Sequence, residues 1–252
     1  SNPDSAFTLL ESVEELDVLS DETFAAWCLA NANVRDILFK EPLSTDYMLR
    51  AFNYFKDKGQ INEQARIGMF LGHAYNASQQ RDKAMNIYLV ALDLADRSQD
   101  YNLAGYINTY LADLYKFEEK YNQAKEKYQE AATYFEKANN LRSRVIAVTN
   151  IGLMSFLLNE DAESVLNQYT FSDSLALQLN DSMVLSMVNN RIALYYRVQE
   201  KYNLAETYLL KSIEYSKLDN IPNYITLSNI LGLQGKIDKS RELLHEILKS
   251  ED

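Results

Sequence analysis

Residues 71–75 read LGHAY, and the motif returns as LADLY at 111–115, IG at 151–152 and IALYY at 192–196. The copies lie about 40 residues apart, a spacing typical of proteins built from stacked repeats. After each copy comes a small residue, then an aromatic residue or Leu four positions later, then a small residue three further on, as in Ala84, Tyr88 and Ala91. The steps i, i+4 and i+7 place such residues on one face of a helix. Each repeat is therefore predicted to contain two helices.

The composition supports a helical array and narrows the class of partner. Gly (7) and Pro (3) are scarce, which disfavours turn-rich β architectures. The net charge of -11 opposes binding to nucleic acid or to an anionic membrane surface, and no run approaches the roughly 18 to 20 apolar residues of a membrane-spanning helix. We predict an all-α fold, a right-handed α-solenoid of antiparallel helix pairs, with no direct nucleic-acid partner and no membrane insertion by this segment.

We expect one domain over residues 1–252. A half repeat at 1–20 begins with Asn2 as a helix cap and Pro3 in the first turn, and its helix carries Val13. A divergent repeat follows at 21–60 and ends at Gly59, where a left-handed turn is expected. Four regular repeats fill 61–252, giving roughly five repeats after the half repeat.

Polar pairs mark the junctions between repeats. Their side chains tolerate left-handed backbone angles or cap the helix that follows. The pairs are Gln99-Asp100, Asn139-Asn140, Asn180-Asp181 and Asp219-Asn220.

The motif resembles the tetratricopeptide repeat, whose consensus contains Leu-Gly, Tyr, Ala, an aromatic residue and Ala. The repeat from Ala65 to Asp96 keeps these elements but lacks the consensus Trp and the closing Pro. The period is about six residues longer than the usual 34, which implies longer helices, as in tetratricopeptide regulators and kinesin light chain. The resemblance covers roughly residues 21–249 and implies binding of a protein or peptide.

A narrower likeness lies near the N-terminal end. The stretches NPDSAFTLLESV at 2–13, AWCLA at 26–30 and STDYMLRA at 44–51 resemble the start of Bacteroidetes tetratricopeptide lipoproteins and regulators. In that family the repeats typically follow a lipoprotein or export signal and often precede a transmembrane helix. The resemblance implies an extracytoplasmic sensor or scaffold portion of a larger membrane-associated or regulatory protein. A cytoplasmic location stays open as the alternative.

The candidate ligand contacts are residues of the first helices that the Leu-Gly-Tyr packing set does not use. In such arrays these helices line the concave face. The candidates are Arg66, Phe70, His73, Tyr106, Tyr110, Asp113, Asn150, Leu153, Asn190, Arg191, Leu194 and Arg197.

Polar side chains in this set suggest how a peptide would be held. An Asn amide both donates and accepts, so Asn150 and Asn190 suit a peptide main chain. Arg191 suits a carboxylate. The alternative is that both Asn residues tie neighbouring helices together. Phe70, Tyr110 and Leu153 would supply apolar contacts.

Signals for catalysis, a cofactor or a metal are weak. The two histidines, His73 and His245, lack the spacing of a zinc site. Cys28 lies between Trp27 and Leu29 on an apolar helix, where a core role is expected. His73 is interpreted either as a ligand contact or as an ordinary exposed imidazole. We therefore predict no enzyme, no catalytic residues, no cofactor and no metal site.

Two functional hypotheses remain beside the disfavoured enzyme. The first is a non-enzymatic scaffold or sensor that binds a protein or peptide along the concave face. The second is a structural module that assembles with itself, as a homo-oligomer, or with a larger complex through its ends. Its motivation is the half repeat at the start and the amphipathic final helix with Leu243, Leu244, Ile247 and Leu248, because repeat arrays normally need a polar closing face.

Overall fold

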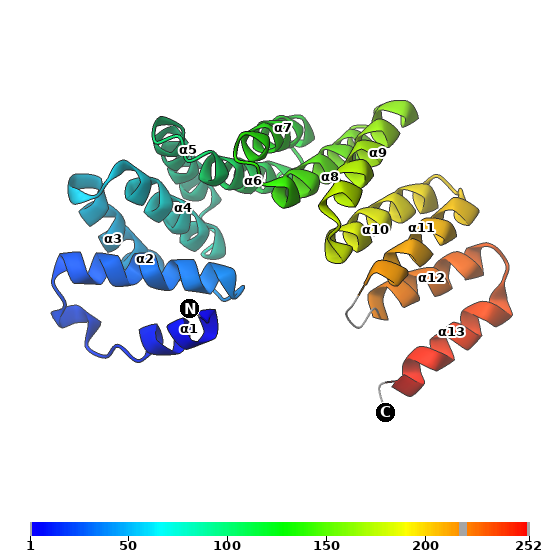
Figure 1. The fold of residues 1–252 in the computed structure, drawn as a ribbon, viewed down its shortest axis with the longest axis horizontal. Coiled ribbons are helices and arrows are strands. Elements are labelled where there is room, and N and C mark those ends of the chain that lie inside the picture. Colours follow the sequence, from blue (N-terminus) through cyan, green and yellow to red (C-terminus); the bar gives the residue numbers. More distant parts are fainter. Residues whose placement is uncertain (1, 217–220, 251–252) are drawn as a thin grey trace. The chain divides into compact units, whose positions relative to one another are not determined.

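The computed structural model describes residues 2–216 and 221–250, and every regular element in those ranges is a helix. Figure 1 shows the helices following one another along the chain as successive hairpins. The all-α prediction is thus confirmed. The elements are α1 (Pro3–Glu11), the short 3-10 helix η1 (Leu16–Val18), α2 (Asp21–Ile37), α3 (Thr45–Lys58), α4 (Ile61–Ala77), α5 (Arg81–Arg97), α6 (Tyr101–Phe117), α7 (Tyr121–Lys137), α8 (Leu141–Leu157), α9 (Ala162–Leu179), α10 (Ser182–Val198), α11 (Tyr202–Tyr215), α12 (Ile221–Leu233) and α13 (Ile237–Ser250).

The chain forms two compact units, residues 1–138 and 139–252. In both, the most extensive contacts join the two helices of one pair, such as α4 with α5 and α10 with α11. Six pairs follow α1 in the described ranges, one more than the roughly five that the sequence leads us to expect, because five pairs rather than four occupy residues 61–250 outside the undescribed stretch 217–220. The expected single domain over the whole chain stays a prediction.

The period of about 40 residues follows from helix length. Helices α4 to α8 each span 17 residues and are joined by short turns. One residue of each turn is left-handed, as at Gln79 (φ 62), Gln99 (φ 58) and Glu119 (φ 58). Such a residue ends a helix by turning the backbone away from the helical path. Long helices, rather than long loops, therefore lengthen this repeat.

The predicted junction pairs act as expected. Gln99, Asn139 and Asn180 are left-handed. The residue after each accepts a hydrogen bond from the next helix, as where Asp100 Oδ1 accepts from the Leu103 amide at 3.0 Å and Asp181 Oδ1 from the Met183 amide at 2.9 Å. These bonds satisfy amides that lack a partner within the helix. The pair Asp219-Asn220 lies outside the described residues.

The half repeat contains one α-helix, α1, whose N-terminus is capped, and the short helix η1. Asn2 Oδ1 accepts from the Asp4 amide at 3.0 Å, which confirms the predicted cap. Helix α1 packs on α2, where the Trp27 Nε1–H donates to the Leu10 carbonyl at 3.0 Å. Val13 was expected on this helix and lies beyond its end at Glu11, so that placement is wrong.

In three of the described pairs, a Gly of the first helix faces an aromatic ring of the second: Gly72 faces Tyr88, Gly105 faces Phe135 and Gly152 faces Tyr169. A Cβ built at Gly152 would lie 2.9 Å from Tyr169 Cε1, and one at Gly72 would overlap the Tyr88 ring. Tyr88 and Tyr169 are buried in this position. The Leu-Gly motif and the Ala-Tyr-Ala motif are therefore two sides of one contact between paired helices.

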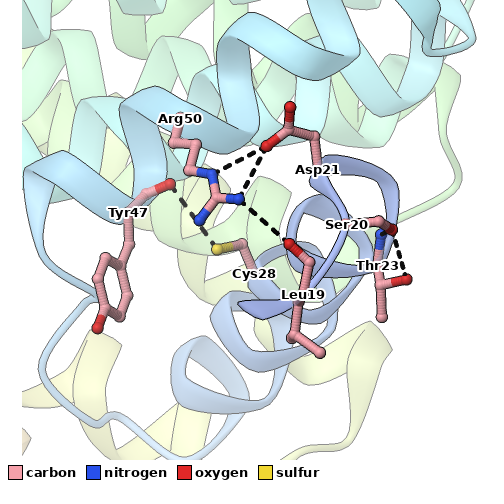
Figure 2. A network of polar contacts seen from close by, with 7 residues as sticks. All are labelled: Leu19, Ser20, Asp21, Thr23, Cys28, Tyr47 and Arg50. Carbon is pink, nitrogen blue, oxygen red and sulfur yellow. Dashed lines mark hydrogen bonds and ion pairs between the residues drawn. The ribbon is translucent and has the colours of Figure 1, made fainter. Parts of the chain in front are cut away.

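The divergent repeat is held by polar contacts between α2 and α3, which Figure 2 shows from close by. The Arg50 guanidinium of α3 donates to Asp21 Oδ1 at 2.8 Å and to the Leu19 carbonyl at 3.4 Å. The Cys28 thiol donates to the Tyr47 carbonyl at 3.8 Å. Burial raises the pKa of this thiol to about 12, so the predicted core role of Cys28 is confirmed.

The expected left-handed turn at Gly59 is wrong, since its φ is -81 and its backbone is extended. A Cβ there would lie 2.6 Å from Phe55 Cδ1. The close Phe55 ring leaves no room for a Cβ at position 59, so this ring, and not a left-handed φ, explains the Gly.

Candidate functional site

A cavity of about 590 Å³ opens in the first unit between helices α2, α4, α5 and α6 and the segment after α2. A cavity of this size suits a small molecule or a few side chains of a peptide. Its walls combine aromatic and apolar side chains with two carboxylates and three basic side chains. They are formed by Ala32, Arg35, Asp36, Lys40, Pro42, Leu43, Met48, Phe70, His73, Asn76, Ala77, Gln79, Arg81, Tyr88, Tyr110, Asp113, Leu114 and Phe117.

Aromatic rings form one continuous group in this cavity. The rings of Tyr88 and Tyr110 are stacked, with centroids 5.8 Å apart and planes at 20°. His73 meets Tyr110 edge to face at 4.3 Å and Phe70 at 5.7 Å. Such edge and stacked contacts fix the rings beyond what area burial alone provides. Phe117 adds a ring that is 64% exposed at the edge of the cavity.

His73 lies within this group as a neutral side chain. Burial lowers the pKa of its imidazole to about 4. Its Nδ1 lies 4.0 Å from Asp36 Oδ1, which is too long for a hydrogen bond, and a neutral imidazole forms no ion pair. Among the described residues its buried Nε2 has no hydrogen-bond partner. His73 is thus mostly buried, at 18% side-chain exposure, rather than an ordinary exposed imidazole.

Two carboxylates, Asp36 and Asp113, affect the pKa of the stacked tyrosines Tyr88 and Tyr110. Burial raises the pKa of Tyr88 and of Tyr110, and the charges of Asp36 and Asp113 raise both further. Asp113 accepts from the Tyr128 hydroxyl at 2.6 Å and pairs with Lys116 Nζ at 2.5 Å.

Asp36 differs from Asp113 in lacking such partners. In the described parts of the chain the Asp36 carboxylate accepts no hydrogen bond, and the one basic side chain within 4.0 Å of it is the neutral His73. Burial raises the pKa of the Asp36 carboxyl, although the side chain is 46% exposed. The carboxylate is partly desolvated without a compensating positive charge.

The basic side chains of the cavity are engaged with other groups. Arg35 pairs with Glu11 at 2.9 Å and its guanidinium lies 5.3 Å from the centre of the Phe7 ring. Lys40 Nζ lies 5.6 Å from the same ring. The Arg81 guanidinium lies 3.9 Å from the centre of the Phe117 ring and donates to Gln79.

Four predicted contacts meet in this cavity. Phe70 and His73 of α4 occupy the same repeat positions as Tyr110 and Asp113 of α6, 40 residues later. Two other predicted residues of these helices do not line the cavity: Arg66 pairs with Asp100 at 3.3 Å, and the Tyr106 ring packs on Phe135 at 5.1 Å.

Asp36 and the other α2 residues of the cavity are not among the predicted contacts. That helix carries no Leu-Gly-Tyr motif, so the repeat register that identified the candidates on α4 and α6 gives no equivalent position on α2.

The second unit has a smaller cavity of about 400 Å³, and Asn190 and Arg191 both line it. Asn190 Nδ2 donates to Asn223 Oδ1 at 2.6 Å, and Asn223 Nδ2 donates to Ser212 Oγ at 3.1 Å. Asn190 therefore ties α10 to α12, as the alternative interpretation expected. The remaining candidates lie on α8 and α10 and are not part of this cavity's lining; they are Asn150, Leu153, Leu194 and Arg197.

The described residues contain neither a metal-binding cluster nor a membrane-spanning helix. No group of three or more His, Cys, Asp or Glu side chains there is arranged to hold a metal ion. No helix in those ranges has both the length and the apolar character needed to cross a bilayer.

Comparison with solved structures shows that the fold recurs at low sequence identity. BtubC (BKLC) from P. vanneervenii has a TM-score of 0.65 at 18% identity, covering 85% of this chain and 91% of that one. The apo form of RapI has a TM-score of 0.64 at 16% identity, covering 98% and 90%. NprR in complex with its cognate peptide NprX has a TM-score of 0.62 at 14% identity, covering 99% and 74%. Such identities establish similarity of fold alone.

Comparison of sequences gives the family. No curated protein matches the chain significantly. The sequence model of the soluble NSF attachment protein family, SNAP, matches residues 6–217, which include all six candidate residues of the first unit and all six of the second. Because this match extends over most of the 252 residues, the chain belongs to the soluble NSF attachment protein family.

Proposed function

We propose that this chain is a non-enzymatic module that binds a peptide segment of a partner protein. The observation that carries the proposal is the aromatic cavity of the first unit, where Phe70, His73, Tyr110 and Asp113 come together. A mostly apolar cavity with a few polar groups is the usual form of a ligand site. The likeness in fold to NprR, whose structure contains a bound peptide, supports a peptide as the ligand.

The same cavity supports a binding role rather than catalysis. Within the described residues its lining contains no Ser, Thr or Cys nucleophile. The imidazole of His73 lies 4.0 Å from the Asp36 carboxylate, so these two groups do not form the hydrogen-bonded pair that orients a general base. We therefore assign the cavity no chemical step.

Selection from a phage-displayed library of random linear peptides tests the proposal. The exposed Ala77 lines the cavity, so Ala77→Trp fills it without disturbing the core. Peptides enriched on the wild-type chain should bind Ala77→Trp at least about tenfold more weakly. The matched control is Ala26→Trp, at an exposed position of α2 outside the cavity, which should bind them like wild type. A selection without enrichment, or equal binding by Ala77→Trp, contradicts the proposal.

A second contact region is proposed in the other unit, around Asn150 and Arg191. Its support is chemical: an amide suits a peptide main chain, and an exposed guanidinium suits a carboxylate. Asn190→Ala would also break the bond to Asn223, so Asn150→Ala is the cleaner variant. Peptides enriched on the Ala77→Trp chain, whose first-unit cavity is filled, should bind Asn150→Ala more weakly at unchanged helicity; unchanged binding rejects this second region.

We also propose that the chain is the extracytoplasmic sensor or scaffold portion of a Bacteroidetes-type regulatory protein. The support is the likeness of residues 2–13, 26–30 and 44–51 described above. The complete open reading frame tests it. A lipoprotein or export signal upstream and a membrane helix downstream are expected, whereas a start codon immediately before residue 1 contradicts the proposal.

Self-assembly is a second candidate function, which exposed leucines near the C-terminal end favour. On α13, Leu244 is 40% exposed and Leu248 62%. Exposed apolar side chains that gather on one element mark interaction surfaces. Light scattering across a concentration series should then show a dimer or larger species that Leu244→Glu abolishes. A monomer at every concentration rejects this candidate.

A further inference from the structure

The cavity of the first unit has a charge pattern that specifies its ligand more closely than shape does. The partly desolvated Asp36 carboxylate lacks a hydrogen-bond partner in the described ranges, and it lies beside an aromatic group formed by Phe70, His73, Tyr88 and Tyr110. We infer that this cavity holds a basic side chain, Arg or Lys, of the bound peptide. This inference rests on the proposed function and adds the chemical class of the anchoring residue.

The negative charge of the cavity interior is uncompensated at Asp36. Asp113 has Lys116 and the Tyr128 hydroxyl as partners, whereas Asp36 has only the neutral His73 at 4.0 Å. A carboxylate that has lost part of its hydration is stabilised by an opposite charge brought beside it. A ligand cation would therefore supply the interaction that Asp36 lacks.

The basic side chains of the cavity do not neutralise Asp36. Arg35 is committed to Glu11 and Phe7, Lys40 lies over Phe7, and Arg81 lies over Phe117. The contact of Arg81 with Phe117 shows that aromatic rings of this cavity already accept a guanidinium over their face. These positions leave the Asp36 carboxylate without a cation of its own.

Arg and Lys side chains match both surfaces of the cavity. Their aliphatic stems pack on apolar walls, while the charged end pairs with a carboxylate or stacks on a ring. A guanidinium is more weakly hydrated than an ammonium and pairs with a carboxylate through two hydrogen bonds. Arg should therefore be favoured at least as much as Lys.

The test uses pools of acetylated and amidated heptapeptides. The central residue is fixed as Arg, Lys, norleucine, Gln or Glu, and the other positions are random. Each pool is passed over the immobilised full chain and the retained peptide is quantified. The Arg and Lys pools should be retained about tenfold more than the norleucine pool. Asp36→Asn should remove this preference. The matched control, Glu126→Gln, removes one exposed charge from α7 of the same unit and should keep it.

The outcomes separate this inference from the proposed function. Equal retention of all pools, or preference for Glu, overturns the basic anchor while peptide binding stands. If no pool is retained, the proposed peptide binding fails. The cation site is then tested alone, by comparing the thermal unfolding temperature in millimolar n-butylguanidinium with that in millimolar n-butanol. If n-butylguanidinium stabilises the wild-type chain and n-butanol does not, and Asp36→Asn removes this stabilisation, the cation site is supported without a peptide. No stabilisation overturns it as well.

Discussion

At the scale of single residues, His73 links the candidate site to the stability of the fold. Its pKa is lowered by burial to about 4, below the value of about 6.5 for an unfolded chain. Between these values the unfolded state binds the proton more strongly, so acidification through this window destabilises the fold. The contribution is absent above pH 7 and amounts to about 2 kcal/mol at pH 5.

Urea unfolding at pH 7, 6 and 5 measures this effect. His73→Asn stays neutral at every pH and should lose about 2 kcal/mol less stability than wild type on going to pH 5. Asp36 acts in the opposite direction, because its raised pKa means that acid stabilises the folded state. Wild type and His73→Asn both contain Asp36, so its effect is common to both pH profiles. The difference between the two profiles therefore belongs to His73. Parallel profiles would show that the imidazole titrates normally.

The candidate site could be predicted from the sequence only where the repeat carries it. Phe70 and Tyr110, like His73 and Asp113, share a register, so the motif that identifies one helix identifies the next. Asp36 lies on a helix without the motif, and its lack of a partner depends on where Arg35, Lys40 and Arg81 turn. Side-chain direction of this kind has no signal in the sequence.

At the scale of helices, the facing tyrosine explains why Gly stands at motif positions 72 and 152. Gly→Ala inside a helix normally stabilises by about 0.5–1 kcal/mol. At Gly72 a Cβ would overlap the Tyr88 ring, whereas at Gly232 the nearest atom is Ser240 Oγ at 3.9 Å. Overpacking costs about 1–3 kcal/mol. Gly72→Ala should therefore lower the free energy of unfolding in chemical denaturation, and Gly232→Ala should raise it. A gain in both variants would mean that the Tyr88 ring moves aside freely.

The positions at which helices begin could be predicted, because residues close in the sequence determine them. The caps at Asn2, Asp100 and Asp181 use side chains next to the helix they begin. The reason for Gly at position 59 could not be predicted from neighbouring residues. Both a left-handed turn and a crowded neighbour favour Gly, and only the position of the Phe55 ring distinguishes them.

At the scale of the whole chain, we predict that the two units unfold together as one domain. The turn that joins them repeats the chemistry of the turns within them: Asn139 is left-handed, and Asn140 Oδ1 accepts from the Ser143 amide at 3.0 Å. In repeat arrays, stability is a sum of repeat terms and nearest-neighbour terms, so a continuous register favours cooperative unfolding. The predicted single domain therefore implies one transition for residues on both sides of this turn.

Equivalent Gly→Ala substitutions in the two units test that prediction. Gly152→Ala brings a Cβ within 2.9 Å of Tyr169 Cε1 in the second unit, while Trp27, the one Trp of the chain, reports on the first unit. If the chain is one domain, Gly152→Ala should shift the Trp27 fluorescence transition and the far-UV circular dichroism transition to the same lower urea concentration, because a cooperative chain loses all its structure together. Gly72→Ala is the control that must shift the Trp27 signal in either case. A Trp27 transition that Gly152→Ala leaves in place, beside a circular dichroism transition that moves or splits, would establish two independently unfolding domains.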